Sequence, residues 1–474
     1  VVPLLHDRRG LSVAVRTVAA MAKAATVYRC SECGWSTGKW AGRCGECQAW
    51  GTVEEAGSTA RRAVAPGPVS EMARPIGAVE LAAARSRPTG VEEFDRALGG
   101  GLVQGAVILL AGEPGVGKST LLLEVAARWA AEAGRALFVT GEESAAQVRL
   151  RAERTGALAD ELFLAAETDL AAVLSHIDQV RPTLLVLDSV QTVTNSGVDG
   201  AAGGVSQVRE VANAMIRAAK ERGMATILVG HVTKDGSIAG PRVLEHLVDV
   251  VLQFEGDRHS RLRMVRAVKN RYGPADEVGC FDLSDQGIVS LADPTGLFLS
   301  RHADVVPGTC VTVTLEGRRP LLAEVQSLVG KSSLATPRRA TSGLDSSRVA
   351  MVLAVLERRG RIQLGSADVY AATVGGARLA EPAGDLPLLL AVASAARDVP
   401  IAAGTVAIGE VGLAGEIRRV TGIQRRLAEA ERMGFSRALV PPDPGPVPRG
   451  IRAVEVHDVA TALSASERPL VSVR

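Results

Sequence analysis

The middle of the chain contains short apolar runs that each lead into a glycine or an acidic residue. The run at 107–110 is followed by GEPGVGKST and then by the helical pattern LLLEVAARWAAEAG, which predicts a strand, a loop and a helix. Apolar runs at 136–140, 183–187 and 226–229 have the length of buried strands. Together these runs predict an α/β core built on a parallel sheet.

The pattern changes on either side of this core. From about residue 296 onward, short strands such as 308–313 alternate with helices such as 346–358, which predicts a second α/β domain. Ahead of the core, residues 55–88 are rich in Pro, Gly, Ser and Ala and have no clear period, so we expect them to be a linker.

Length and charge narrow the class of protein. At 474 residues the chain is too long for one ordinary core, so about three domains are expected. No apolar run approaches the roughly 20 residues that a membrane-spanning helix needs, so no membrane partner is expected. The net charge is only +2, from 54 Lys+Arg and 52 Asp+Glu, and any contact with nucleic acid must therefore come from local patches.

The first residues lack the pattern of a signal peptide. Segment 1–20 contains arginines and has no continuous apolar region followed by a small-residue cleavage site. The chain begins with Val, and Met21 stands shortly before the first cysteine. We therefore expect residues 1–25 to be an extension that is disordered or that arises from a start site assigned too early.

Four of the six cysteines lie in two C-x-x-C pairs, Cys30 with Cys33 and Cys44 with Cys47, separated by ten residues. Two such turns can supply the four thiolates of a tetrahedral zinc site, and a closed shell indicates a structural ion. A redox C-x-x-C is the alternative. Residues 26–54 are therefore predicted to be a C4 zinc ribbon, and this cysteine usage is typical of the reducing cytoplasm.

Three tryptophans and two basic residues accompany these cysteines. Trp35, Trp40 and Trp50, with Lys39 and Arg43, either form a surface for stacked bases or a protein partner, or make up the core of this small module. The pattern leaves both interpretations open.

The loop GEPGVGKST matches the phosphate-binding pattern G-x-x-x-x-G-K-[ST] between a strand and a helix. Its glycines let backbone N–H groups turn toward phosphates, and the helix N-terminus adds partial positive charge. Lys118 is expected to bridge the β- and γ-phosphate oxygens of ATP, and the Ser119 hydroxyl to bind Mg²⁺. The predicted nucleotide-binding residues are Gly112, Glu113, Pro114, Gly115, Val116, Gly117, Lys118, Ser119 and Thr120, joined by Asp188 and His231.

Polar residues at the ends of the other strands extend this predicted site. Asp188 follows a strand expected beside the phosphate loop, and it is predicted to hold Mg²⁺ together with Ser119. His231 is a candidate sensor of the γ-phosphate, although a histidine at a strand end is often structural. Glu142 is the candidate general base for the attacking water, with Glu143 as its rival. The alternative is that this acidic pair only starts a helix.

The ordered motifs of the chain resemble those of one known family. The segments TGVEEFDRALGGGLVQGAVILLAGEPGVGKST, FVTGEES, LLVLDSVQTV, GHVTKDGSIAGPRVLEHLVDVVLQFEGD and KNRYG are similar to those of the bacterial RadA (Sms) DNA-repair family, and the resemblance covers about residues 26–474. It implies a RecA-like P-loop ATPase core at 89–292, behind the zinc ribbon, and a Lon-protease-like α/β domain at 293–474.

The resemblance also implies roles for residues that composition alone would class as solvated charges. In KNRYG, Lys269 and Arg271 become catalytic residues that reach the nucleotide of a neighbouring subunit, and a Lys-x-Arg spacing on a strand would put both on one face. The Gly-rich stretch 194–207 matches a DNA-binding loop, and Lys234 and Arg242 are candidate phosphate contacts in a second loop.

The predicted protease-like domain lacks the residues for proteolysis. The turn EPAGD puts Ala383 where the family's nucleophilic serine stands, and VTGIQRR puts Gln424 at the position of the lysine. Ser394 falls within the following helix, away from the turn. Five basic residues in this part either line DNA or are scattered surface charges: Arg318, Arg319, Lys331, Arg338 and Arg339.

These features predict an enzyme that hydrolyses ATP with Mg²⁺ and carries Zn²⁺. The leading hypothesis is a DNA-stimulated, ring-forming homohexameric motor of recombinational repair that acts on single-stranded and branched DNA with a recombinase partner. The alternative hypothesis is an ATP-driven signalling switch that acts on protein partners. Ala383 and Gln424 argue against an ATP-dependent protease.

Overall fold

The computed structural model describes residues 27–55, 73–78, 85–231, 243–256, 261–284, 287–299 and 305–467. The chain divides into two compact units, Val1–Val79 and Glu80–Arg474. The predicted extension 1–25, most of the predicted linker, and Lys234 and Arg242 lie outside the described residues.

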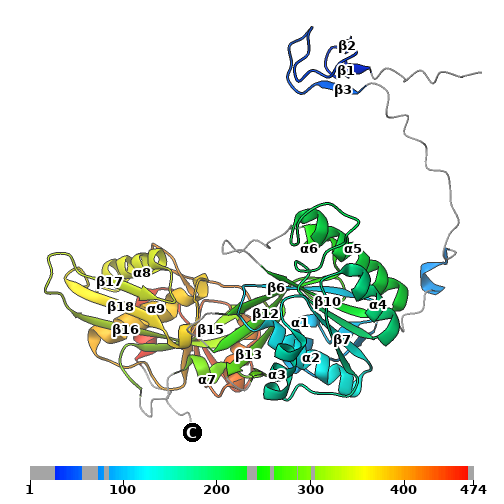
Figure 1. Ribbon diagram of the computed structural model, residues 1–474. Coiled ribbons are helices and arrows are strands. Elements are labelled where there is room, and N and C mark those ends of the chain that lie inside the picture. The colour runs from blue at the N-terminus through cyan, green and yellow to red at the C-terminus, as the bar shows by residue number, and fades with distance from the viewer. Residues whose placement is uncertain are drawn as a thin grey trace, which may run out of the picture. The chain divides into compact units, whose positions relative to one another are not determined.

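The first unit contains a small antiparallel sheet (Figure 1). Its strands are β1 (Tyr28–Cys30), β2 (Ser36–Thr37) and β3 (Val53–Glu55), in the order β2-β1-β3. The buried side chains Cys30, Cys44 and Val53 form its core, so two of the four clustered cysteines belong to the packing of this module. A short 3₁₀ helix, η1 (Ile76–Ala78), follows in the sequence.

A nine-stranded sheet forms the centre of the second unit, in the order β14-β13-β12-β11-β6-β10-β9-β7-β8. The six strands from β11 to β8 are parallel, whereas β12, β13 and β14 each run antiparallel to the strand that precedes them in the sequence. All four strands expected from the apolar runs are present. The strand bounds are β6 (Val107–Gly112), β7 (Ala136–Thr140), β8 (Leu162–Ala166), β9 (Leu184–Asp188), β10 (Ala225–His231), β11 (Val250–Gly256), β12 (Leu262–Asn270), β13 (Val278–Ser284) and β14 (Gly287–Ser290).

Helices cover both faces of this sheet, because alternate residues of its strands point to opposite sides. In β6, Ile108 and Leu110 pack against α1, α2 and α3, whereas Val107 and Leu109 pack against α4, α5 and α6 (Figure 1). The helix bounds are α1 (Glu92–Leu98), α2 (Lys118–Glu132), α3 (Ala145–Thr155), α4 (Leu170–Val180), α5 (Val205–Arg222) and α6 (Val243–Leu247). A hairpin of β4 (Ser86–Arg87) and β5 (Leu102–Val103) flanks α1.

The C-terminal part of this unit is a second α/β body around a seven-stranded mixed sheet, β17-β18-β16-β15-β19-β22-β23. One core joins the sheet to α8, α9 and α11, and another joins it to α10. The sheet strands are β15 (Thr309–Glu316), β16 (Arg319–Lys331), β17 (Arg339–Ser342), β18 (Ala367–Thr373), β19 (Thr405–Ala407), β22 (Arg437–Val440) and β23 (Arg452–Glu455). The remaining elements are α7 (Thr295–Phe298), α8 (Ser346–Arg359), η3 (Val374–Gly376), η4 (Pro382–Gly384), α9 (Asp385–Arg397), β20 (Glu410–Val411), β21 (Ile417–Arg418), α10 (Ile423–Arg432) and α11 (Val459–Ser466).

A buried ion pair joins the two bodies of this unit. Arg319, at the start of β16, contacts the carboxylate of Glu93 in α1 and donates to the carbonyl oxygens of Val278 and Ala292. Only 7% of the Arg319 side chain and 2% of the Glu93 side chain are exposed. The suggestion that Arg319 lines DNA is therefore wrong, because its guanidinium is buried and bound to Glu93 and to backbone oxygens of this junction.

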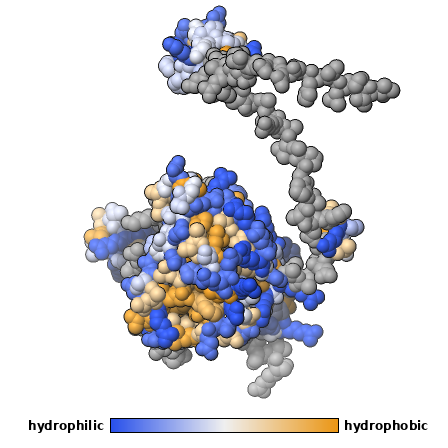
Figure 2. All heavy atoms as spheres, turned by 45° about the vertical axis from the view of Figure 1, so that its right-hand side comes forward, coloured by the Kyte–Doolittle hydropathy of each residue, from blue (hydrophilic) through white to orange (hydrophobic). Residues whose placement is uncertain are grey.

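Among the described residues, no helix is both long and apolar enough to cross a bilayer. In the view of Figure 2, hydrophilic residues predominate at the top and right of the larger unit, and hydrophobic residues gather at its lower left.

Candidate nucleotide and zinc sites

The phosphate-binding loop connects β6 to α2. Gly115 (φ 80°) and Gly117 (φ 111°) both adopt left-handed backbone angles, which explains why the pattern needs glycine there. Gly117 caps α2 without any side-chain hydrogen bond, so the first N–H groups of the helix are left for a ligand. Gly112 packs so closely on β11 that an added Cβ would lie 2.6 Å from the Phe254 carbonyl oxygen.

Lys118 is buried at the start of α2, with 4% of its surface exposed. Its ammonium group donates to the carbonyl oxygens of Gly112 (2.9 Å) and Glu113 (2.8 Å). Burial lowers the pKa of Lys118, while nearby carboxylates act in the opposite direction. The ammonium group of Lys118 thus lies against the loop that is expected to bind the phosphates.

Asp188 ends β9 and lies close to Ser119, although β10 separates β9 from β6. The end of β9 thus reaches the phosphate loop even though β9 and β6 are not neighbouring strands. Burial raises the pKa of Asp188, and the hydrogen bond with Ser119 opposes that rise. Among the described residues, no hydrogen-bond partner reaches the buried Oδ1 of Asp188. A buried, unpartnered carboxylate oxygen beside a hydroxyl fits a Mg²⁺ site.

Glu142 and His231 form a direct hydrogen bond, with Nε2 and Oε1 2.7 Å apart. The other ring nitrogen, Nδ1, lies 3.3 Å from the Lys118 ammonium, which can only donate. His231 therefore accepts at Nδ1 and donates at Nε2 to Glu142. Ser189 also donates to Glu142, at 2.7 Å. The His231 hydrogen bond is the main reason that the pKa of Glu142 falls to about 2.

Ser189 was not anticipated from the sequence. Its only signal was its place directly after Asp188, since the contact with Glu142 spans 47 residues.

The geometry separates Glu142 from its rival. Both carboxylate oxygens of Glu143 are bound by Arg151 of α3, one of them at 2.7 Å. The helix start itself depends on a capping box between Ser144 and Gln147. Glu142 takes no part in that cap, so of the two acidic residues it is the one directed at the phosphate loop.

Lys269 and Arg271 lie far from the phosphate loop of their own chain. The Lys269 ammonium donates to the backbone oxygens of Glu245 and Val248, both at 2.7 Å, and Arg271 pairs with Asp249 at 3.1 Å. Asp249 in turn accepts from the backbone N–H of Val107, the first residue of β6.

These contacts put the two basic residues at the end of the sheet where the parallel strands begin, whereas the phosphate loop lies at the end where they finish. The phosphate loop follows the last residue of β6, and a six-residue strand is about 17 Å long. Strand alternation does not explain how the pair is oriented, because β12 ends at Asn270 and has a bulge near Val268.

The Gly-rich stretch after β9 is tied to the start of α5. The Gln207 side chain accepts from the Asn195 N–H (2.8 Å) and donates to the carbonyl oxygens of Asn195 and Val198. The backbone of this stretch is therefore anchored at its base, between β9 and α5.

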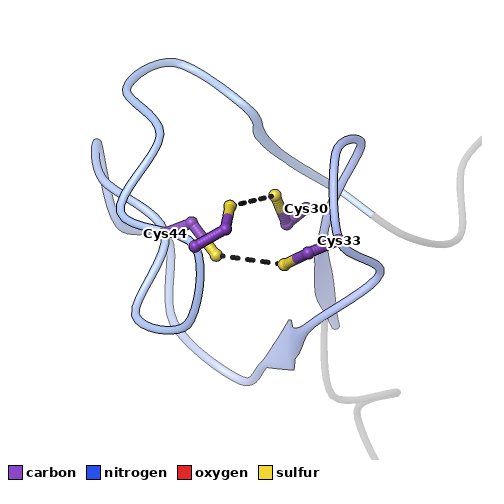
Figure 3. Close-up of side chains that lie close together, drawn as sticks. Cys30, Cys33 and Cys44 are labelled. Carbon is purple, nitrogen blue, oxygen red and sulfur yellow. Dashed lines mark hydrogen bonds between the residues drawn. The ribbon is translucent and has the colours of Figure 1, made fainter.

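The four clustered cysteine sulfurs lie within 4.8 Å of one another (Figure 3). The Sγ–Sγ distances are 3.7 Å for Cys30–Cys47 and 3.6 Å for Cys33–Cys44. A tetrahedron with Zn–S bonds of about 2.3 Å has edges of about 3.8 Å, so the sulfurs fit zinc. A hydrogen bond with Thr52 lowers the pKa of Cys30 to about 6, which favours the thiolate that zinc binds.

The tryptophans of the ribbon divide between core and surface. Trp35 packs on the core, close enough that a Cβ on Gly45 would lie 2.8 Å from its ring. Trp40 and Trp50 are 67% and 75% exposed, and the Arg43 guanidinium lies 5.6 Å from the Trp50 ring centre. Trp35 therefore belongs to the core of the module, whereas a binding role for the exposed Trp40 and Trp50 stays a prediction.

Structural contacts occupy the turns that correspond to a protease site. Ala383 is 1% exposed within η4, and the Gln424 amide donates to the Pro444 carbonyl oxygen at 2.9 Å. The fully buried Arg426 forms an ion pair with Glu381 beside these turns. Sequence reasoning missed this pair, because arginine and glutamate are common surface residues.

Two further polar candidates of this body are also held by local contacts. The Ser394 hydroxyl accepts from the Gly308 N–H (2.9 Å) and donates to the Val399 carbonyl oxygen (2.6 Å). Arg318 pairs with Glu277 at 3.4 Å. These contacts give both side chains structural partners.

Three family models match separate parts of the chain. A family described as "AAA domain" matches residues 79–237, one described as "Rubredoxin metal binding domain" matches 28–55, and one described as "Subunit ChlI of Mg-chelatase" matches 377–444. Proteins named "DNA repair protein RadA" are similar over 94% of the chain. The relative from Mycolicibacterium smegmatis is 55% identical over 97% of its length, that from Streptococcus pyogenes serotype M1 is 43% identical over 99%, and that from Bacillus subtilis is 42% identical over 99%.

Proposed function

The chain belongs to the RadA family of DNA repair proteins, and on that premise we propose that it is a DNA-stimulated ATPase that works as a ring-forming motor. In this proposal it processes or migrates branched strand-exchange intermediates during recombinational repair, together with a recombinase. The functional parts are a zinc ribbon at 26–54, a linker at 55–88, the ATPase at 89–292 and a Lon-like domain at 293–474.

The nucleotide-binding part of the proposal rests on the phosphate loop and its neighbours. Lys118 exchanges its two loop carbonyls for β- and γ-phosphate oxygens, and Ser119 with Asp188 holds Mg²⁺. The metal supplies electrostatic stabilisation of the transferring phosphoryl group.

Glu142 and His231 orient the attacking water in this proposal. A carboxylate with a pKa near 2 is a weak base at neutral pH, so Glu142 acts by orientation while His231 holds it. Because His231 also contacts Lys118, it registers the arrival of the γ-phosphate.

The proposal that the chain forms a ring rests on the position of Lys269 and Arg271. Both lie at the start of the parallel strands, and their own phosphate loop lies at the opposite end of the sheet. They can therefore serve as trans-acting cations only in the pocket of a neighbouring subunit. A homohexamer closes such a head-to-tail interface into a ring through which DNA passes.

The C-terminal body acts as a scaffold in this proposal. Ala383 offers no nucleophile and Gln424 no amine base, so we expect no cleavage of unfolded casein with ATP.

Mixed rings test the shared pocket directly. Lys118→Ala and Lys269→Ala are each expected to abolish most DNA-stimulated turnover, and a mixture of the two is expected to regain a measurable fraction. In that mixture some pockets combine an intact phosphate loop with an intact neighbouring lysine. A mixture of Lys118→Ala with Glu142→Gln is the matched control, since both defects lie in the same half of the pocket and no recovery is expected.

Recovery in the control, or none in the test mixture, contradicts a pocket shared between subunits. A wild-type ATPase rate that single-stranded DNA leaves unchanged at low salt favours the signalling switch instead.

A further inference from the structure

Strand β12 lies between the ATPase core and the C-terminal body. On one side Val265 and Ala267 pack in the core under α2. On the other side Leu262 belongs to a cluster with Leu321 of β16. The strand ends at Asn270, directly before Arg271.

Arg263, near the start of β12, reaches the phosphate loop. Its side chain is 8% exposed, and Nε donates to the carbonyl oxygen of Val116 at 3.0 Å. Nη1 donates to the Leu262 carbonyl oxygen at 2.9 Å, which fixes the plane of the guanidinium. A buried, permanently charged group is costly unless it is hydrogen-bonded, so this placement is strongly constrained.

The hydrogen bond to Val116 determines how the next peptide group points. The C=O of Val116 and the N–H of Gly117 belong to one planar trans peptide and point in opposite directions. A donor that holds this oxygen on the β12 side therefore turns the Gly117 N–H away from β12. Gly117 is the left-handed residue at the N-terminus of α2, where N–H groups face a phosphate.

The strand opposite leaves room for this arginine. Gly256 of β11 is the cross-strand partner of Arg263, and a Cβ on it would lie 2.3 Å from Arg263 Cδ and 2.7 Å from Nε. The φ angle of Gly256 is outside the left-handed region, so alanine there changes the space and not the allowed backbone.

We propose that Arg263 is a positioning residue for the phosphate loop, and that it links nucleotide binding in one subunit to the basic residues at the far end of β12. The linkage rests on the proposed function, since it gives Lys269 and Arg271 a role in the next subunit's pocket. The positioning of the loop does not depend on that role.

Nucleotide binding by the purified full-length chain tests the positioning. In Arg263→Gln, the Kd for a fluorescent ADP analogue and the KM for ATP are expected to rise about tenfold, because one phosphate-facing N–H is misdirected. The value of kcat at saturating ATP should change less. Gly256→Ala is expected to have the same effect by displacing the arginine, and the double variant should be no worse than Arg263→Gln alone.

Arg261→Gln is the matched control. Arg261 lies just before β12 and pairs with Asp282 on the surface, so its loss should leave both constants unchanged. If Arg263→Gln binds nucleotide as the wild type does, or if the effects of Gly256→Ala and Arg263→Gln simply add, the positioning role is wrong.

Hydrogen exchange tests the linkage separately. An ATP analogue is expected to slow amide exchange along 262–270 in the wild type and to leave it unchanged in Arg263→Gln at nucleotide concentrations that saturate both proteins. Equal protection in the two proteins overturns the linkage. Failure of DNA to stimulate the wild-type ATPase would overturn the proposed motor and leave the binding result intact.

Discussion

His231 donates a 2.7 Å hydrogen bond to Glu142 from the end of a strand two positions away in the sheet. The same ring contacts Lys118 through its other nitrogen. A single imidazole therefore connects the residue expected to hold the γ-phosphate with the residue expected to orient water. These contacts form a continuous path from Lys118 through His231 to Glu142.

We expect His231→Ala to move the acid limb of the ATPase pH profile upward. The hydrogen bond is the largest cause that depresses the Glu142 pKa from 4.5 to about 2, so its loss raises that pKa. A carboxylate with a depressed pKa keeps its charge until the pH falls through the lowered value, and the variant loses its charge earlier. Rates measured from pH 4 to 8 check this, with the exposed His246→Ala as control. An unmoved acid limb contradicts the assignment.

We expect Asp188→Asn to weaken Mg²⁺-dependent ATP binding while stabilising the chain without nucleotide. Burial raises the Asp188 pKa, which means that the ionised form destabilises the fold at neutral pH. Removing that charge should raise the Tm of the ligand-free protein by about 2 °C. Calorimetry with and without Mg²⁺ and ATP measures both effects. Asp178→Asn, on the surface beside Arg222, is the control, and a lower Tm for Asp188→Asn speaks against this account.

We expect Cys44→Ser to remove one zinc ion per chain and to unfold the ribbon. Cys44 is both a ligand candidate and part of the small core with Cys30 and Val53. The melting of the larger unit should not change, because its cores contain no ribbon residues. Metal analysis together with calorimetry tests this, and Ser31→Ala serves as control. Full zinc content in Cys44→Ser would falsify the four-cysteine site.

We expect Arg319→Met to destabilise the larger unit by about 3–5 kcal/mol, because it leaves the buried Glu93 carboxylate without its ion-pair partner. Replacing both residues, as Glu93→Leu with Arg319→Met, should recover part of that loss. Urea unfolding gives the free energies. Arg318→Met, whose side chain is 44% exposed, should cost less than about 1 kcal/mol. Equal losses for Arg318→Met and Arg319→Met would show that burial of the pair is unimportant.

Features encoded in contiguous residues could be predicted from the sequence. The phosphate loop needs left-handed glycines at fixed positions, and both Gly115 and Gly117 have them. The paired cysteines aim four sulfurs at one point through two short turns. The buried strand at 136–140 has the predicted bounds, since a fully buried strand is a continuous apolar run.

The arrangement of distant residues depended on the folded chain. Glu142 and His231 are 89 residues apart, and Arg319 is 226 residues from Glu93. No local pattern distinguishes Arg319, which is buried in a junction, from Arg318, which is partly exposed beside it. Backbone preferences act over a few residues, whereas the partner that satisfies a buried charge is chosen by packing across the whole unit, and sequence spacing does not record that choice.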